Sequence, residues 1–276
     1  MSHRAITRID HTGATHDDTW GIAVEAPVAI LINGVPWTVM LATPSDLEDL
    51  AIGMLLTEHV IDSASRITSI GVGELLDEFT VSVDIPDEAI DREALGARTL
   101  ISNTACGLCG IESLADLHRR RGEWQAVVSV NDDAIRLALR TLPGHQPLNA
   151  ATHSVHAAAW CALDGSIQLV REDVGRHNAL DKLVGSLARA GCLAEQGFVL
   201  MSSRCSYELV YKTSVLNAQA LASVSAPTNL ALRWAGQLGI PLVTCLGRGD
   251  ALEIVRFTPP ASPPFDSFED MVHVGC

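Results

Sequence analysis

The sequence predicts an α/β protein, with α+β elements in its N-terminal part and a mixed sheet with helices on both faces in its C-terminal part. Short apolar runs of strand length alternate with segments of helical periodicity from residue 166 to residue 246, a pattern typical of strands joined through helices. Asn33-Gly34 and Asp164-Gly165 each separate two apolar runs. They indicate β-hairpins, which add antiparallel neighbours to a sheet.

The first 125 residues are predicted to form a flexible tail, residues 1–21, and an N-terminal α+β domain, residues 22–125. Asn33-Gly34 supplies the positive φ angles that a type I′ turn requires. Ser45 and Glu48 have the spacing of a capping box at the start of a helix. The helix carries apolar residues on one face, at Leu47, Leu50, Ala51, Met54 and Leu55. Strands are expected at residues 28–32, 35–41, 67–73 and 79–85.

A C-terminal α/β domain is predicted for residues 126–276. Asn131 caps its first helix, which ends before Pro143 because proline cannot continue the hydrogen-bond pattern. Gly239 closes its last helix. Strands are expected at residues 156–163, 166–170, 198–201, 221–225 and 242–246, and further helices at residues 178–189, 206–219 and 228–238. The proline-rich residues 259–264 are expected to form an extended tail.

Charge and composition restrict the classes of partner. The chain has 19 basic and 33 acidic residues and a formal net charge of -14, so it lacks the surplus of Lys and Arg with which proteins bind nucleic acid. The sequence shows no signal peptide and no apolar run long enough to span a membrane. Its seven cysteines are an odd number and mostly single, which favours a reducing cytoplasm. Cys161, Cys192 and Cys245 are expected to be core residues.

The most informative motif is Cys106-Gly107-Leu108-Cys109, which is followed by Gly110. Two thiols at this spacing serve as metal ligands, as a dithiol–disulfide couple, or as carriers of sulfur in a persulfide. The glycines let the backbone approach a ligand or a partner sulfur closely. They argue against a fourth alternative, in which both cysteines are buried only for packing.

Zinc and thioredoxin-like interpretations fit the rest of the chain poorly. A structural zinc site needs four ligands, but there is no second CxxC pair, and His118 has no histidine partner three to five residues beyond it. A zinc nucleobase deaminase needs an H-x-E motif and a proline before its first cysteine; this chain has no H-x-E and has Ala105 there. A thioredoxin-like pair lies in a βαβ unit, whereas two strands and a hairpin precede Cys106. We therefore expect no structural metal.

Three polar segments join predicted strands to predicted helices. Such turns commonly build ligand sites at one rim of an α/β sheet, and free N–H groups at a helix start together with Arg204 can hold a phosphate. Plainer alternatives stay open, because Asn178 with Asp181 can cap a helix and His177 can be a structural hydrogen-bond donor. The segments lie at residues 172–179, 202–208 and 225–228.

Together these features resemble the formate dehydrogenase accessory sulfurtransferase family, FdhD. The resemblance spans residues 22–257, and its five ordered segments make it far more specific than a lone CxxC motif. The segments are TPSDLEDLAIG at residues 43–53, CGLCG at 106–110, EDVGRHNALDK at 172–182, SRCSYELVYK at 203–212 and SAPTNLA at 225–231.

The resemblance implies a relay of sulfur. A cysteine desulfurase hands sulfane sulfur to a cysteine of the family protein as a persulfide. The persulfide passes sulfur to the bis-guanine-dinucleotide molybdenum cofactor and so makes formate dehydrogenase, or a related molybdoenzyme, competent. Cys106 is expected to carry the persulfide and Cys109 to assist it. A homodimer and a C-terminal part similar to the cytidine deaminase fold, without its zinc site, are also implied.

The chain departs from the family's pattern at three places. The family tends to have T-G-G-x-H, S-G-R and G-F-x-R. This chain has Thr152-His153-Ser154-Val155-His156, Ser202-Ser203-Arg204 and Thr244-Cys245-Leu246-Gly247-Arg248, the last of which is one residue longer than the family's segment. Each departure replaces or moves a glycine that would let the backbone approach a ligand.

A guanine nucleotide, for which GDP is a partial mimic of the cofactor, is expected at the rim formed by the strand-to-helix turns. Arg204 and Arg248 would add positive charge, and Gly247 would allow close approach. The open alternative is that residues 247–250 merely form the turn of a hairpin. A chaperone that binds the cofactor without moving sulfur, and a dithiol oxidoreductase, remain alternative functions. The expected cofactor-binding residues are Cys245, Leu246, Gly247, Arg248, Gly249, Asp250, Arg204 and Thr228.

Overall fold

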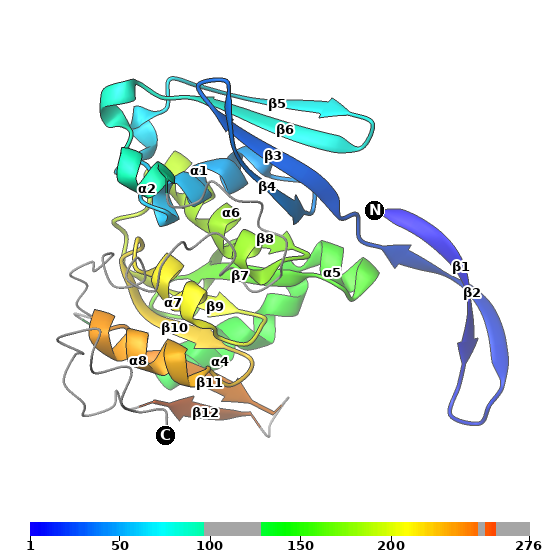
Figure 1. Ribbon diagram of the computed structural model, residues 1–276. Coiled ribbons are helices and arrows are strands. Elements are labelled where there is room, and N and C mark those ends of the chain that lie inside the picture. Colours follow the sequence, from blue (N-terminus) through cyan, green and yellow to red (C-terminus); the bar gives the residue numbers. More distant parts are fainter. Residues whose placement is uncertain (97–127, 248–251, 258–276) are drawn as a thin grey trace, which may run out of the picture.

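The computed structural model describes residues 1–96, 128–247 and 252–257 of the 276-residue chain. Within these residues it contains three sheets, of two, four and six strands. Figure 1 shows the four-stranded sheet at one end of the body, with α1 (Leu47–Thr57) and α6 (Arg176–Arg189) between it and the six-stranded sheet. The mixed α/β architecture predicted from the sequence is confirmed.

The N-terminal residues form a hairpin instead of the predicted flexible tail. β1 (Ser2–Ile9) pairs antiparallel with β2 (Thr15–Ile22), and the pair projects from the body in Figure 1. The Asp10 carboxylate holds the turn by accepting hydrogen bonds from the N–H groups of Thr12 and Ala14, at 2.8 and 3.0 Å. Both strands are polar and largely exposed, so they lack the apolar alternation by which strands are recognised in a sequence.

The four-stranded sheet has the order β4-β3-β6-β5, in which β3 and β6 are parallel and the outer pairs are antiparallel. Asn33 and Gly34 have φ angles of 50° and 77°, which confirms the predicted type I′ turn between β3 and β4. Parallel pairing requires a crossover connection, and α1 lies within it. The strands are β3 (Ala26–Ile32), β4 (Val35–Ala42), β5 (Ser69–Leu75) and β6 (Glu78–Asp84).

Helix α1 begins without the predicted capping box. Asp46 occupies the N-cap with a φ of 51°, and no side chain caps the helix, while Ser45 donates its backbone N–H to the carbonyl of Thr43 at 2.8 Å. Every residue of α1 except Glu48 is buried, so the helix is covered on all sides and not along one face. Three short elements follow this region: η1 (Ala64–Arg66), η2 (Asp87–Ala89) and α2 (Arg92–Gly96).

The six-stranded sheet has the order β12-β11-β10-β9-β7-β8. β9, β10 and β11 are parallel, and the remaining neighbours are antiparallel, so the sheet is mixed as predicted. Gly165, with a φ of 92°, lies in the turn of the predicted β7–β8 hairpin. The strands are β7 (His156–Cys161), β8 (Ile167–Asp173), β9 (Gly197–Met201), β10 (Ala218–Ser223), β11 (Leu242–Leu246) and β12 (Glu253–Arg256).

Helices cover both faces of the six-stranded sheet, as the sequence predicts. Along β9, Phe198 belongs to the hydrophobic cluster beneath α4, whereas Val199 belongs to the cluster shared by α6, α7 and α8. Asn131 caps α4 through its side chain as predicted, and Thr228 caps α8 in the same way. The helices are α4 (Asp132–Thr141), η3 (Leu142–His145), α5 (Pro147–Thr152), α6, α7 (Tyr207–Thr213) and α8 (Asn229–Leu238).

Two predicted helix boundaries in this region are wrong. The helix expected at residues 206–219 ends at Thr213, because the chain turns into the buried strand β10 at Ala218. Helix α6 begins at Arg176, two residues before Asn178. The Asn178 side chain donates to the carbonyl of Leu41 at 2.9 Å, so it ties α6 to β4 and does not serve as the N-cap.

Helices α1 and α6 cross with their backbones in contact. A Cβ atom added to Gly53 would lie 1.8 Å from the carbonyl oxygen of Asp181, and one added to Gly185 would lie 1.9 Å from that of Asp49. Neither distance is possible for a real side chain, so both positions require glycine. This crossing joins the N-terminal region to the C-terminal region.

Buried ion pairs connect the same two regions. Lys182 is fully buried and contacts Asp173 Oδ2 at 2.6 Å and the carbonyl of Thr43 at 2.9 Å. Lys212 Nζ contacts Asp181 at 2.9 Å and Glu58 at 3.0 Å. A buried charge that loses its partner is strongly destabilising, so these pairs hold the two regions in one arrangement.

The predicted domain boundary near residue 125 lies outside the described residues. One hydrophobic cluster contains residues from both predicted domains, for example Leu55 of α1 and Leu183 of α6. The two parts therefore share a core. Across residues 1–96, 128–247 and 252–257, no helix has the length and apolar character needed to cross a membrane.

We expect Gly53→Ala to lower the free energy of unfolding by about 3 kcal/mol, because its Cβ would force α1 away from α6. Gly71→Ala is the matched control: a Cβ there meets nothing within 4 Å, and its effect should stay within about 0.5 kcal/mol. Urea unfolding measures both. Equal midpoints for the two variants would show that the helices separate without cost.

Candidate functional site

The carboxyl ends of four strands lie along one edge of the six-stranded sheet. β9, β10 and β11 are parallel, and β8 points the same way because β7 is antiparallel to both β8 and β9. The three polar strand-to-helix segments therefore meet there: a β-bridge links Cys205 to Pro227, and His177 Nε2 lies 3.4 Å from Ser206 Oγ. We call this edge, formed by residues 172–179, 202–208, 225–228 and 244–247, the rim.

Asp173 organises the first segment of the rim from a fully buried position. Its Oδ1 accepts hydrogen bonds from Gly175 N at 2.8 Å and Asn178 Nδ2 at 3.0 Å. Its Oδ2 accepts from Thr43 N at 2.9 Å and Lys182 Nζ at 2.6 Å. The carboxylate is thus fully engaged, and Lys182 offsets its charge. Asp173, Asn178 and Lys182 therefore have a structural role.

His177 links the first segment of the rim to the second. Its Nε2 lies 3.4 Å from Glu208 Oε2, and the two side chains are only 12% and 9% exposed. Burial raises the pKa of Glu208, but hydrogen bonds from His177 and Ser206 outweigh burial and hold that pKa below its usual range. A serine triad needs the serine and the acid on opposite nitrogens of the histidine. Here both contact Nε2, so Ser206 is not set up as a nucleophile.

Arg176 is the first residue of α6 and His156 the first residue of β7, and the two are close enough to interact electrostatically. Burial, followed by the charges of Arg176 and His177, lowers the pKa of His156, against a smaller opposing effect of Asp173; His156 is therefore neutral near pH 7. Arg176 is partly buried, and its Nε has no hydrogen-bond partner. Both residues lie in segments that the sequence singled out, 172–179 and 152–156, but no ligand-binding role was predicted for either, because a single sequence does not show that the fold brings them together.

The predicted cofactor-binding residues that the structure describes lie further along the rim, after β9, before α8 and at the end of β11. Arg204 and Thr228 are exposed there, and the Thr228 hydroxyl accepts the N–H of Ala231 at 3.2 Å, as an ordinary N-cap does. Thr244 Oγ1 donates to the carbonyl of Ser225 at 3.3 Å. This hydrogen bond ties the end of β11 to the segment that enters α8.

The end of β11 differs in part from the predicted wall of the site. Leu246 and Gly247 are exposed, and Gly247 has a φ of 87°, which suits glycine. The Cys245 side chain instead packs into the hydrophobic cluster beneath α4, so it offers no thiol to the rim. Arg248, Gly249 and Asp250 lie outside the described residues.

Cys106 and Cys109 also lie outside the described residues, but the structure characterises four other cysteines. Burial raises the pKa of Cys161 and of Cys205 to about 12, and that of Cys245 to about 11. Cys192, predicted to be a core residue, is partly exposed, and a hydrogen bond to Glu195 raises its pKa. Because the thiolate is the nucleophile, the three buried cysteines are poor sulfur acceptors.

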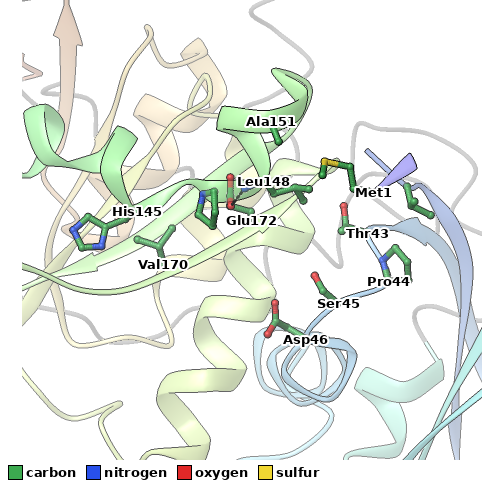
Figure 2. Close-up of a pocket in the computed structure, with 12 residues that line it drawn as sticks. Met1, Thr43, Pro44, Ser45, Asp46, His145, Leu148, Ala151, Val170 and Glu172 are labelled. Atoms are coloured by element: carbon green, nitrogen blue, oxygen red, sulfur yellow. Dashed lines mark hydrogen bonds between the residues drawn. The ribbon is translucent and has the colours of Figure 1, made fainter. Parts of the chain in front are cut away.

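A cavity of about 550 Å³ lies close to the first segment of the rim. Figure 2 shows residues 43–46 along one wall, opposite Leu148 and Glu172. The two oxygens of Glu172 accept the backbone N–H groups of Leu148 and Asn149, both at 2.8 Å, and so cap α5. Sequence analysis missed this short helix, whose one signal is Pro147 at its first position. Among the described residues, no three His, Cys, Asp or Glu side chains are grouped to hold a metal ion.

The fold and the rim define an α/β protein with polar strand-to-helix turns gathered at one sheet edge. The model of the FdhD/NarQ family matches residues 23–258. The chain therefore belongs to the FdhD/NarQ family, which confirms the resemblance found in the sequence. The hairpin β1–β2 precedes the matched residues.

Individual relatives agree with this assignment. "Sulfur carrier protein FdhD" of Xanthomonas euvesicatoria pv. vesicatoria is 43% identical over 222 residues, which cover 80% of this chain and 79% of the relative. The protein of that name from Cupriavidus necator is 46% identical over 221 residues, 80% and 77% of the two chains. The crystal structure of a putative formate dehydrogenase accessory protein from Desulfotalea psychrophila has the same fold, with a TM-score of 0.68, 23% identity and coverage of 92% and 95%. The similarity to cytidine deaminases stays a prediction.

We expect Cys161, Cys205 and Cys245 to resist alkylation in the native protein at about pH 8. With a pKa near 12, about one Cys205 in ten thousand carries a thiolate at that pH, and burial excludes the reagent. Peptide mapping by mass spectrometry after a short iodoacetamide pulse reads this out, with guanidinium-unfolded protein as the control in which all three react. Native labelling of Cys205 as fast as a free thiol would contradict the buried assignment.

Proposed function

We propose that this chain is a sulfur carrier that accepts sulfane sulfur as a persulfide on Cys106, assisted by Cys109. The observation that carries the proposal is the CGLCG motif in a chain of the FdhD/NarQ family. Relatives at 43% and 46% identity bear the name sulfur carrier protein. The structure narrows the choice, since Cys161, Cys205 and Cys245 are buried with raised pKa values, and among the four other cysteines only Cys106 and Cys109 form a CxxC pair.

The proposed first step is a transfer between thiols without any external oxidant. The Cys106 thiolate attacks the terminal sulfur of a persulfide on a cysteine desulfurase. The old sulfur–sulfur bond breaks, and the desulfurase thiolate leaves. Cys109 then either takes the terminal sulfur in the same way or attacks the inner sulfur. In the second case the two cysteines are oxidised to a disulfide while the sulfane sulfur is reduced and released as hydrosulfide.

We propose the bis-guanine-dinucleotide molybdenum cofactor as the sulfur acceptor, and formate dehydrogenase or a related molybdoenzyme as the protein served. The name formate dehydrogenase accessory protein, borne by the similar Desulfotalea psychrophila structure, agrees with this partner. A guanine nucleotide arm would lie at the rim between the end of β11 and α8, beside Arg204 and Thr228. A homodimer is proposed for the assembly.

We expect intact mass to rise by about 32 Da per chain, the mass of one sulfur atom, when the protein is incubated with a cysteine desulfurase and cysteine, and dithiothreitol to reverse the gain. Cys106→Ala should abolish the gain, whereas Cys192→Ala, the control for a partly exposed thiol, should retain it. Loss of the mass gain in Cys109→Ala alone would mean that Cys109, and not Cys106, carries the persulfide. Loading of Cys106→Ala and Cys109→Ala alike at the wild-type rate would remove the pair as the acceptor and favour a cofactor chaperone. A disulfide without added sulfur would favour a dithiol oxidoreductase.

We expect GDP to bind the wild-type protein in calorimetry, and Arg248→Ala to weaken it by roughly tenfold, the usual effect of losing a charged hydrogen bond to phosphate. Arg140→Ala, which removes an exposed charge on α4, is the control. No heat of binding from the wild type at millimolar GDP would contradict the proposed nucleotide site. Unchanged affinity in Arg248→Ala would remove residues 245–250 from it.

A further inference from the structure

Within residues 1–96, 128–247 and 252–257, no carboxylate pairs with the Arg176 guanidinium. Four buried side-chain nitrogen or oxygen atoms in the described residues lack a hydrogen-bond partner, and Arg176 Nε is the one that belongs to a charged group. A partly buried guanidinium is unfavourable unless an anion completes its hydrogen bonds. Arg171, on the preceding strand, shows the usual solution, with Asp49 at 2.8 Å. The missing hydrogen-bond acceptor for Arg176 Nε therefore points to an anion that is not part of the described chain.

The groups around Arg176 favour an anion and not a cation. His156 is neutral and offers one ring N–H donor. The one nearby carboxylate on this segment, Asp173, already accepts four hydrogen bonds, including that of the buried Lys182. Glu208 is held by His177. The carboxylates of Asp173 and Glu208 are thus already engaged, whereas Arg176 and His156 still have N–H groups to donate.

The start of α6 adds further donors beside Arg176. Gly175 occupies the N-cap, and no side chain caps this 14-residue helix. The first N–H groups of an α-helix have no intrahelical acceptor, and they carry the positive end of the helix dipole. A planar guanidinium with five N–H donors next to them suits a phosphate group, which it can bind through two parallel hydrogen bonds.

We propose that Arg176, together with His156 and the first N–H groups of α6, binds a phosphate group of the nucleotide ligand. This inference rests on the proposed cofactor binding and deepens it. Going along the sheet from β11 to β8 crosses four strand spacings of about 4.8 Å, or roughly 19 Å. The Arg176 site is therefore a second phosphate subsite, separate from the one expected at the end of β11. Two such subsites suit a ligand with two nucleotide arms.

Calorimetry with inorganic pyrophosphate and with GDP, in phosphate-free buffer, tests the Arg176 site on the full-length protein. We expect Arg176→Gln to weaken the binding of pyrophosphate by roughly tenfold or more, and the control Arg140→Gln to bind as the wild type does. Because Arg176 makes no hydrogen bond through Nε in the fold, the variant should unfold at the wild-type temperature. If Arg176→Gln fails to fold, Arg176→Lys serves instead. It keeps the charge but cannot form two parallel hydrogen bonds to one phosphate, so weaker binding of pyrophosphate is again expected.

Three results would overturn the phosphate site. They are pyrophosphate binding by Arg176→Gln at wild-type affinity, no pyrophosphate binding by the wild type, and Arg176-dependent binding of thiosulfate but not of pyrophosphate. The last result would make the site one for a sulfur anion. Failure of the proposed function is seen separately, since desulfurase-dependent mass gain reports sulfur carriage and GDP binding that depends on Arg248 reports the other subsite.

Discussion

The contact between the backbones of α1 and α6 is the constraint on which the rest of the structure depends. Gly53 and Gly185 let the helices touch, and this closeness brings Thr43 to within 2.9 Å of the Asp173 carboxylate. Asp173 in turn sets the turn from β8 into α6. The turn that carries Arg176 therefore depends on two residues that have no side chain.

Buried charge makes this docking specific. Apolar surfaces can slide over one another at little cost, whereas Lys182 and Lys212 are satisfied in one register alone, because desolvation makes any unpaired position strongly unfavourable. The segment EDVGRHNALDK thus combines two roles. Asp173, Asn178 and Lys182 hold the two parts of the chain together, and their hydrogen bonds are complete. Arg176 lies between them in the sequence and has an N–H group without an acceptor. The segment therefore both connects the two parts of the chain and belongs to the candidate site.

The sequence predicted the elements that local chemistry determines. Asn33-Gly34 forms its turn because glycine and asparagine accept positive φ, and Asn131 and Thr228 cap their helices through their own side chains. The complete burial of β9 likewise follows from its apolar run. The family resemblance, with its five segments, carried the function, since no local pattern alone distinguishes a sulfur carrier from a redox pair.

The errors arose where distant residues decide. The capping box at Ser45 is absent because Asp46, in the left-handed region, takes the N-cap. Asn178 leaves its expected cap for a carbonyl 137 positions away. The N-terminal hairpin is stabilised by polar turn contacts and by Trp20, whose Nε1 donates to the carbonyl of Thr152 at 3.2 Å, and none of this alters hydrophobic periodicity. The proximity of Arg176 and His156 depends on strand order, which a single sequence does not specify.

The separation of partners along the chain has a consequence for synthesis in the cell. Helix α1 is buried on nearly every side; the N-terminal sheet covers one side of it, but the opposite side is covered by α6, and the Thr43–Asp173 contact spans 130 positions. At about 5–20 residues per second, a ribosome needs roughly ten seconds to make that stretch. During this interval the side of α1 that meets α6 has no partner, and the nascent chain is exposed to aggregation and to chaperones that bind such segments. Completion of α6, not of the N-terminal sheet, is the event that ends this exposure.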